Sequence, residues 1–316
     1  MSVAFPMRIT FMGSPNFAIP ALRALQSEGH KVTLVVTQPD RPAGRGRKLQ
    51  MSPVKIEANA LNIPVFQPES FKSSDNVQTL VEASPDLIVV AAYGIILPKK
   101  VLEIPTLGTL NIHPSLLPRW RGPSPIQSAI LAGDGSTGIS IIFLNEEMDA
   151  GPILSQQEVE ISPSETTGEL EERLAEIGAL ALTKCVDEFK NGIPIADPQD
   201  EEKVTFCQLI SKQAGHLRSD MTVIQADRAV RAYSPSPGAF VNYRGSKLVI
   251  RRASSVSDEM DVPRGVLLRY GNFPAISFDG GILVLEELQR SGRARVNGTD
   301  FLNGERGVLH EIGFAN

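Results

Sequence analysis

Asp86-Leu-Ile-Val-Val-Ala-Ala92 is the run of residues that most clearly indicates how the first part of the chain folds. Such a near-continuous apolar run is typical of a parallel strand buried on both faces of a sheet. Two more runs, Arg8 to Met12 and Lys31 to Thr37, predict strands, and Phe17 to Gln26 between them has the apolar spacing of a helix. Strands that alternate with helices predict a doubly wound α/β sheet over roughly the first 190 residues.

The chain changes character after this region. A helix with a charged outer face is expected from Thr166 to Phe189, and the turn formers and acids from Asn191 to Glu202 predict a linker. Beyond it, five short β-rich runs separated by Gly, Pro and Asp predict a small antiparallel β-barrel that is OB-like. These runs are Ala239–Tyr243, Lys247–Arg251, Gly265–Tyr270, Ala275–Phe278 and Ile282–Leu285. We therefore expect an α/β domain (residues 1–190), a linker (191–207) and a smaller β domain (208–316).

Composition excludes several classes of protein. A hydrophobic content of 42% with 21% charged residues is ordinary for a soluble globular protein, and 316 residues suffice for two domains. No apolar run approaches the ~18 residues of a membrane span, and no basic region precedes an apolar stretch at the N-terminus, so we expect a cytoplasmic protein without membrane contact. Cys185 and Cys207 lack metal-type spacing and are expected to be reduced structural thiols. Gly13 stands alone after the first strand, so a nicotinamide or flavin site is not supported.

The net charge of −5 is unevenly distributed along the chain. Residues 1–206 carry 17 Lys and Arg against 25 Asp and Glu, a balance of −8, whereas residues 207–316 carry 14 against 11, a balance of +3. The mildly basic second part fits an anionic macromolecular partner, although chance variation explains the difference equally well.

The run Leu107 to His113 predicts a strand that carries an amide and an imidazole on one face. Side chains alternate along a strand, so Asn111 and His113 point the same way and lie roughly 7 Å apart. Pro114 cannot extend the strand, which places His113 at its carboxyl end, where ligands bind in open α/β sheets. Both groups are able to reach one carbonyl oxygen or its leaving group. The alternative, a turn asparagine and a satisfied edge histidine, stays open from spacing alone.

Asp149 is the carboxylate that completes this candidate set. It follows the apolar run Ile139 to Leu144 and therefore has the placement of a residue that projects from the end of a strand. A carboxylate beside His113 would orient the imidazole ring and favour its protonated form. Because Ala150, Gly151 and Pro152 come next, a simple turn aspartate is the other interpretation.

Two arginine-containing segments are candidate ligand contacts. Ser115 to Gly122 holds the only tryptophan of the chain, flanked by Arg119 and Arg121, and is either a packed proline-rich loop or a wall for a planar anionic ligand. The segment Asp40 to Lys48 places several cations among glycines; these are Arg41, Arg45, Arg47 and Lys48. It is either solvated surface or a flexible contact for a phosphate backbone.

Several motifs together resemble one protein family. The marks of the folate-dependent formyltransferases are Asn111-Ile-His113, Pro114-Ser-Leu-Leu-Pro118 and Met148-Asp-Ala-Gly151. Narrower marks are Thr37-Gln-Pro-Asp-Arg-Pro-Ala-Gly-Arg-Gly46, Ala92-Tyr-Gly-Ile-Ile-Leu-Pro98 and Leu116-Leu-Pro-Arg-Trp-Arg-Gly122. With them the chain resembles the methionyl-tRNA formyltransferases within that family, from about Arg8 to Leu182 and more loosely through Arg231-Ala-Tyr233.

The resemblance implies roles for particular residues. It implies that Asn111, His113 and Asp149 are the catalytic residues. It implies that the folate pocket is lined by Ser115, Leu116, Leu117 and Pro118. It also implies that the arginine segment, and Arg45 in particular, holds the acceptor stem of a tRNA; the contacts expected there are Arg41, Arg45, Arg47 and Lys48.

The resemblance further implies a fold and a reaction. The N-terminal domain would be Rossmann-like and catalytic, and the C-terminal domain OB-like and in contact with tRNA. The implied reaction transfers the formyl group of the co-substrate 10-formyltetrahydrofolate to the free amino group of methionyl-initiator-tRNA. From the chemistry of this reaction we expect direct attack through a tetrahedral intermediate, and we expect a monomer that uses no metal.

Two positions depart from the family pattern, both in the C-terminal domain. Ser236 stands between Pro235 and Pro237 where the family often has Trp, and Gln213 to His216 lack the acids expected after Lys212. These departures bear on details of tRNA contact. Three rival functions also stay open: formylation of another amine, tRNA binding without catalysis, and hydrolysis of the formyl-folate.

Overall fold

The computed structural model describes residues 5–43, 48–257 and 263–305. It divides into two compact units. The first unit comprises Met1–Pro125, Thr137–Glu160 and Glu171–Cys207, and the second comprises Ile126–Ser136, Ile161–Leu170 and Gln208–Asn316. The second unit thus takes in two short pieces of chain that precede the predicted linker.

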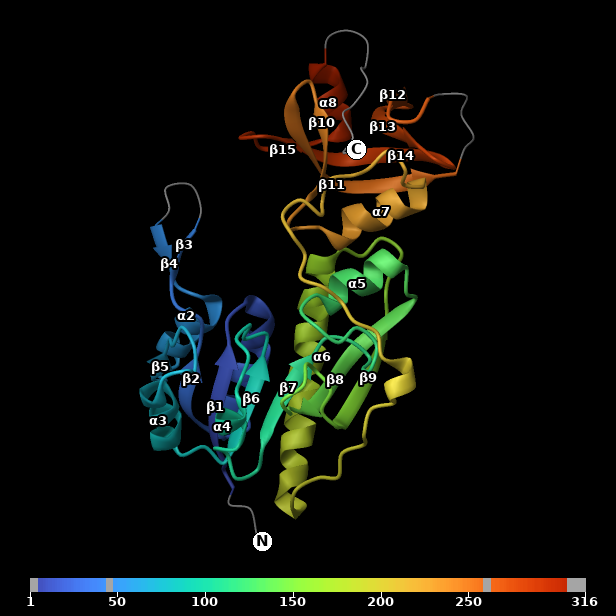
Figure 1. The fold of residues 1–316 in the computed structure, drawn as a ribbon. Coiled ribbons are helices and arrows are strands. Elements are labelled where there is room, and N and C mark those ends of the chain that lie inside the picture. Colours follow the sequence, from blue (N-terminus) through green and yellow to red (C-terminus); the bar gives the residue numbers. More distant parts are fainter. Residues whose placement is uncertain (1–4, 44–47, 258–262, 306–316) are drawn as a thin grey trace. The chain divides into compact units, whose positions relative to one another are not determined.

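A seven-stranded sheet forms the centre of the first unit, in the order β5-β2-β1-β6-β7-β8-β9 (Figure 1). Its strands are β1 Arg8–Gly13, β2 Lys31–Val36, β5 Val65–Phe66, β6 Leu87–Ala91, β7 Thr109–His113, β8 Ser136–Phe143 and β9 Ile153–Glu160. The strands β5, β2, β1, β6 and β7 run parallel, whereas β8 is antiparallel to β7. Every residue of β6 and β7 is buried, because both faces of the sheet are covered. The predicted doubly wound α/β domain is confirmed.

Helices pack against both faces of this sheet. The helices of the first 191 residues are α1 Ile19–Ser27, α2 Pro53–Ala60, α3 Ser74–Ala83, α4 Lys99–Leu102, α5 Pro125–Ala132 and α6 Thr167–Glu188, with short 3-10 helices η1 Asn16–Ala18 and η2 Phe189–Asn191. Of these, α5 belongs to the second unit from Ile126 onward. On one face, Leu80 of α3 and Val101 of α4 join a buried cluster with Met12 and Val90 of the sheet. At β7, the helix α6 comes so close that a Cβ added at Gly178 would lie 2.9 Å from Cγ2 of Ile112.

Some elements of the first unit have no apolar run in the sequence and were not predicted from it. The edge strand β9 is largely exposed, and Val159 is its only buried residue. A separate two-stranded ribbon pairs β3 Arg41–Ala43 with β4 Lys48–Gln50, within the arginine segment. An edge strand or an exposed ribbon has little apolar surface to bury, so its sequence shows no strong periodicity.

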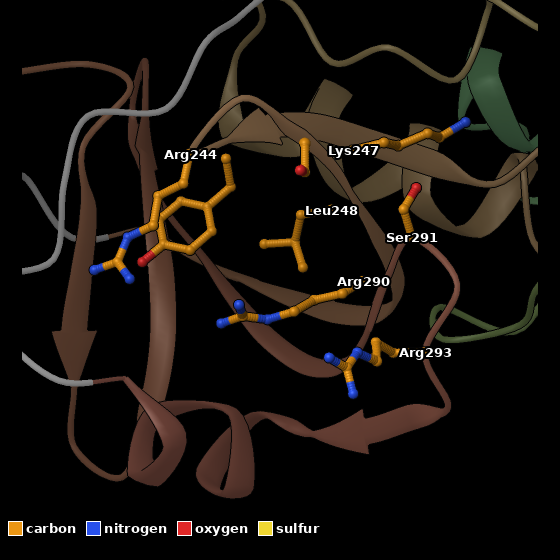
Figure 2. Close-up of a pocket in the computed structure, with 8 residues that line it drawn as sticks. Arg244, Lys247, Leu248, Arg290, Ser291 and Arg293 are labelled. Carbon is orange, nitrogen blue, oxygen red and sulfur yellow. The ribbon is translucent and has the colours of Figure 1, made fainter.

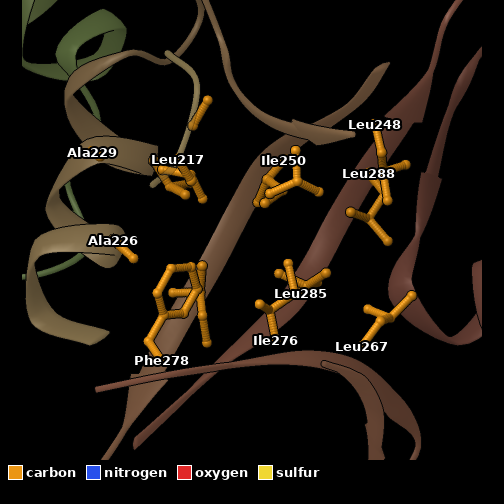
Figure 3. Close-up of a cluster of buried hydrophobic side chains, with 14 of the residues drawn as sticks. Leu217, Ala226, Ala229, Leu248, Ile250, Leu267, Ile276, Phe278, Leu285 and Leu288 are labelled. Carbon is orange, nitrogen blue, oxygen red and sulfur yellow. The ribbon is translucent and has the colours of Figure 1, made fainter. Parts of the chain in front are cut away.

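The second unit is built on an antiparallel sheet in the order β10-β11-β14-β13-β12, with β15 paired to β14 (Figure 1). Its elements are α7 Val223–Ala232, β10 Ala239–Tyr243, β11 Ser246–Val256, β12 Leu267–Tyr270, β13 Phe273–Phe278, β14 Gly281–Arg290, β15 Arg295–Asn297 and α8 Gly298–Gly304. Ala226 and Ala229 of α7 pack in one buried cluster with Ile250 and Leu285 of the sheet (Figure 3). The predicted small antiparallel domain is confirmed.

Two strands of this sheet are longer than the sequence predicted. The register of β11 against β14 shifts between Ile250 and Ala253, and beyond the shift β11 continues with exposed serines at Ser254 and Ser255. A bulge of this kind changes which residues face the core, so the apolar alternation in the sequence stops before the strand does.

Within the described part of the chain, no helix is long and apolar enough to cross a membrane.

Candidate active site

The strand β7 positions an amide and an imidazole on one face of the sheet. Asn111 pairs with Val90 of β6, which in turn pairs with Met12 of β1, so all three side chains lie in one row across the sheet. Ile112 points the other way, toward α6. Asn111 and His113 therefore share the face opposite α6, at the carboxyl end of the strand, and are 9% and 4% exposed.

Asp149 reaches the same place by a different route from the one the sequence predicts. We expected it to project from the end of a strand, but β8 is antiparallel to β7, so β8 ends beside Leu110, away from His113. The loop between β8 and β9 then turns back. It brings Oδ2 of Asp149 to 3.6 Å from Nδ1 of His113, and Oδ1 to 3.5 Å from Nδ2 of Asn111. The structure thus gathers the three candidate residues into one cluster.

The carboxylate of Asp149 is anchored by backbone contacts. The backbone N–H of Gly122 donates to its Oδ2 at 2.9 Å. The backbone of Asp149 has a φ of 50°, in the left-handed region, where a residue other than glycine carries strain. Two residues later the turn is so tight that a Cβ on Gly151 would lie 1.7 Å from the carbonyl oxygen of Phe143. This position requires glycine.

The imidazole of His113 has an acceptor near each nitrogen. Its Nε2 lies 3.0 Å from the carbonyl oxygen of Trp120, and because a carbonyl only accepts, Nε2 must be the donor. Its Nδ1 faces the Asp149 carboxylate. The distances from Asp149 to Nδ1 and to the Asn111 amide are at or beyond the long end of hydrogen bonding, so the Asn111 amide keeps an N–H for a substrate atom, whereas Nδ1 donates only when the ring carries both protons.

The segment Ser115 to Pro118 divides into buried and partly exposed residues. Ser115 and Leu117 are buried, and the Ser115 hydroxyl donates to the carbonyl oxygen of Arg119 at 2.6 Å. The hydroxyl of Ser140 accepts from the Leu117 N–H at 3.1 Å and donates to the Ser115 carbonyl at 2.7 Å. Leu116 and Pro118 remain half-exposed. Among these four residues, only Leu116 and Pro118 are partly open to solvent.

The two arginines beside Trp120 have different surroundings. The guanidinium of Arg119 lies 4.4 Å from the centre of the Trp120 ring, and Trp120 is half-buried. Arg121, however, is only 3% exposed, and its guanidinium is paired with Glu201 at 2.7 Å. A buried arginine that is already paired does not offer its charge to an anionic ligand. For Arg121, the structure therefore supports a packed loop and not a wall for an anionic ligand.

The segment predicted as a linker is in close contact with the site. The Thr205 hydroxyl accepts from the Trp120 N–H at 2.9 Å, and the Thr205 N–H donates to the Pro118 carbonyl at 3.2 Å. Gln199 donates to the carbonyl oxygens of Asp149 and Gly151 at 2.7 and 2.8 Å. Sequence reasoning missed both residues, because polar side chains in a turn-rich segment give no signal of what they contact.

The two thiols are free and buried. Cys207 also belongs to this segment, and its Sγ accepts from the Ser124 N–H at 3.2 Å. Burial raises the pKa of the Cys185 thiol to about 11. The expected reduced structural thiols are consistent with these positions.

The arginine segment is anchored at its base. The Nζ of Lys55 donates to Asp40 at 2.7 Å and to Gln67 at 2.6 Å, and Gln67 donates to Asp40 at 2.8 Å. These hydrogen bonds, with that from Lys55 the largest, hold the pKa of the Asp40 carboxyl below its usual range. Arg41 is exposed on β3. Arg45 and Arg47 lie outside the described residues, as does the side chain of Lys48.

The second unit contains a basic pocket of about 190 Å³ (Figure 2). Its lining residues are Tyr243, Arg244, Ser246, Lys247, Leu248, Arg290, Ser291 and Arg293. Glu305, which is nearly buried, pairs with Arg244 at 3.0 Å and also with Arg290. Lys247 lies 3.6 Å from the centre of the Phe240 ring, and burial lowers its pKa. The wall is cationic, with part of its charge balanced by Glu305.

The residues that depart from the family pattern lie in this second unit. Ser236 is exposed in the loop that follows α7. His216 stacks on Phe240, with 4.6 Å between the ring centres.

Among the residues that the structure describes, no group of three or more His, Cys, Asp and Glu is arranged to hold a metal ion.

An α/β sheet with an amide, an imidazole and a carboxylate gathered at a strand end defines an enzyme that handles a carbonyl group. Residues 7–186 of this chain match the formyl transferase family, and residues 209–306 match the formyl transferase C-terminal domain family. The chain belongs to the formyl transferase family.

Individual relatives agree with this assignment. A Chloroflexus aurantiacus protein named methionyl-tRNA formyltransferase is 44% identical over 94% of this chain and 97% of its own length. One of the same name from Stenotrophomonas maltophilia is 45% identical over 95% of this chain and 98% of its own length. The crystal structure of HypX from Aquifex aeolicus in complex with tetrahydrofolic acid has a TM-score of 0.64 over 94% of this chain, at 18% identity; the chain spans 47% of that protein. At that identity the likeness concerns the fold alone.

Replacing Gly151 by Ala is expected to displace the loop that carries Asp149, because the added Cβ would overlap the Phe143 carbonyl oxygen. We expect the free energy of unfolding in urea to fall by ~1–3 kcal/mol. Formyl transfer should fall by about 10- to 100-fold, as the carboxylate moves. The control is Gly135→Ala, where the added Cβ meets no atom within 4 Å. A Gly151→Ala protein with normal stability and activity would show that the turn tolerates a side chain.

Proposed function

We propose that this protein transfers the formyl group of 10-formyltetrahydrofolate to the free amino group of methionyl-initiator-tRNA, giving N-formylmethionyl-tRNA. The observation that carries the proposal is the approach of Asp149 to His113 and Asn111, at 3.6 and 3.5 Å, at the end of β7. Likeness over nearly the whole chain to relatives named methionyl-tRNA formyltransferase supports the choice of acceptor.

The reaction needs little activation of the nucleophile. An ordinary α-amino group has a pKa of ~7.7–8.0, so a large fraction is neutral near physiological pH. Its nitrogen attacks the formyl carbon, and the carbonyl electron pair moves onto oxygen. The pair then returns, the bond from carbon to the folate nitrogen breaks, and that nitrogen takes up a proton while the amine loses one. The difficult species is the tetrahedral intermediate with its oxyanion.

The three clustered residues suit this intermediate. Asn111 Nδ2 would donate to the oxyanion, as would His113 Nδ1 when the ring carries both protons, and a donor to an oxyanion typically contributes about 10²–10³ in rate. Proton transfer through His113, or through a water held by Asp149, would add about 10²–10⁴. Each nitrogen of the ring has an acceptor nearby, the Trp120 carbonyl at Nε2 and the Asp149 carboxylate at Nδ1. Direct transfer requires no covalent enzyme intermediate.

The folate co-substrate would lie against the segment Ser115 to Pro118. The half-exposed Leu116 and Pro118 offer apolar contact, as a planar ring system requires. Ser115 and Leu117 are buried and hydrogen-bonded inside the protein, so they would hold the segment in shape. The residues present therefore fit such a ligand.

The tRNA would contact both parts of the protein. We assign the acceptor stem to the arginine segment, with Arg41, Arg45, Arg47 and Lys48 as its cations. The C-terminal OB-like domain, whose residues carry a balance of +3, would contact the phosphate backbone through cations such as those of the basic pocket (Figure 2). The anchored base of the arginine segment at Asp40 and Lys55 supports a defined place for these contacts.

Rival functions make different products. Incubation with labelled 10-formyltetrahydrofolate and charged initiator tRNA should give labelled formyl-methionyl-tRNA. Formyl transfer to small amines alone would point to another acceptor, and accumulation of formate would point to hydrolysis. No turnover despite tRNA binding would mean that the protein binds tRNA without catalysis.

Replacement of Asn111 by Ala removes one oxyanion donor. We expect the single-turnover rate of formyl transfer to fall by about 10²–10³-fold while tetrahydrofolate still binds. The matched control is Asn191→Ala, which removes an exposed amide at the end of η2. If Asn111→Ala reacts at the wild-type rate in a single turnover, Asn111 has no part in the mechanism.

Replacement of Arg45 by Ala removes one cation of the arginine segment. We expect the apparent KM for tRNA to rise more than kcat falls, and the slope of log affinity against log salt to decrease by about 1. Arg45→Lys keeps the charge and should keep the salt dependence. An unchanged KM and slope in Arg45→Ala would assign the segment another role.

A further inference from the structure

The backbone conformation of Asp149 needs support from outside its own loop. A φ of 50° is strained for a residue with a side chain, although aspartate tolerates it better than most. Only a surrounding structure that fixes such a conformation keeps it populated. The Gly122 N–H fixes the carboxylate but leaves the backbone carbonyl groups of the loop to be satisfied by other residues.

Gln199 supplies that support. Its Nε2 donates to the carbonyl oxygen of Asp149 at 2.7 Å and to that of Gly151 at 2.8 Å. A side-chain amide nitrogen has two hydrogens, and both are used. Gln199 is 9% exposed, so these bonds are formed away from competing water.

Arg121 fixes the orientation of this amide. Its Nε donates to Oε1 of Gln199 at 2.9 Å, and its Nη2 pairs with Glu201 at 2.7 Å. Rotation of the amide by 180° would place its NH₂ against a guanidinium and its oxygen against two carbonyl oxygens. One orientation is therefore strongly favoured.

The contacts close into a ring around Asp149. From the backbone of Asp149 the path runs to Gln199, then to Arg121, along one peptide bond to Gly122, and back to the Asp149 carboxylate. The ring fixes both the backbone and the side chain of Asp149. Its backbone carbonyl accepts from Gln199, and its Oδ2 accepts from the Gly122 N–H.

The segment that carries Gln199 is itself held at both ends. Asp197 and Ile153 exchange backbone hydrogen bonds of 2.7 and 2.8 Å. Downstream, the Arg121 N–H donates to the Thr205 carbonyl at 2.9 Å, and the Cys207 N–H donates to the Arg121 carbonyl at 2.8 Å. Gln199 is thus presented by fixed backbone on either side.

We propose that Gln199 is a positioning residue for formyl transfer: it fixes the backbone of Asp149 and thereby the place of the carboxylate beside His113. The proposal rests on the proposed function of that site. Each polar atom of the Gln199 side chain is engaged by protein, so the residue acts through Asp149 and does not touch the substrate. A segment that joins the two units in the sequence is then part of the active-site structure.

The test is a double-mutant cycle on the full-length protein. We expect Gln199→Ala to lower kcat for formylation of methionyl-tRNA by about 10- to 100-fold, with the KM for both substrates within about twofold. In the Asp149→Asn background, Gln199→Ala should lower kcat by no more than about twofold, because the group it positions is already lost. The control Gln78→Ala removes an exposed glutamine of α3 and should leave kcat unchanged.

Two results would overturn the proposal. One is a Gln199→Ala enzyme with the wild-type kcat; the other is a full effect of Gln199→Ala in the Asp149→Asn background. Gln199→Glu removes both N–H donors but keeps the side-chain size and a partner for Arg121, and it should show the same loss of kcat with tetrahydrofolate binding intact. A wild-type protein that does not formylate methionyl-tRNA would instead contradict the proposed function, before any variant is compared.

Discussion

The hydrogen bond from the Gly122 amide to the Asp149 carboxylate is the contact around which the candidate active site is arranged. The chain reaches Asp149 from β8, an antiparallel strand that ends beside the amino-terminal end of β7, away from His113. A tight turn and a residue in the left-handed conformation then bring the chain back. Once held, the carboxylate faces His113 and Asn111 together. The Trp120 carbonyl then fixes the opposite side of the imidazole. The contacts from Gly122 and Trp120 use backbone groups, whose places are set by the fold.

Sequence reasoning predicted the parts of the fold that bury apolar surface. The run Leu87–Ala91 is buried throughout, and its continuous hydrophobicity identified a central parallel strand. Alternation along β7 predicted that Asn111 and His113 share a face, because strand geometry is local. The return of Asp149 and the contacts of Gln199 were not predictable, since they depend on the direction of β8 and on backbone atoms distant in sequence. The make-up of the second unit is likewise non-local, because residues 126–136 and 161–170 join it through tertiary packing.

Arginines that look alike in the sequence differ in their exposure to solvent in the structure. Arg121 lies beside Trp120 in a segment that resembles a ligand wall, yet it is paired with Glu201 and bonded to Gln199. An unpaired guanidinium in that place would be strongly unfavourable, so its role is structural. Arg41, by contrast, is exposed on β3 and keeps its charge at the surface. The same residue type is thus buried and hydrogen-bonded beside the candidate active site in one place and exposed to solvent in another.

We propose that Asp149 acts on the reaction through His113. The single-turnover rate of formyl transfer tests this proposal in the variants His113→Asn and Asp149→Asn and in the double variant. If the two residues work as one unit, the double variant should be about as slow as the slower single variant. Rate losses that multiply in the double variant would contradict the account, because they would mean that the two groups contribute independently.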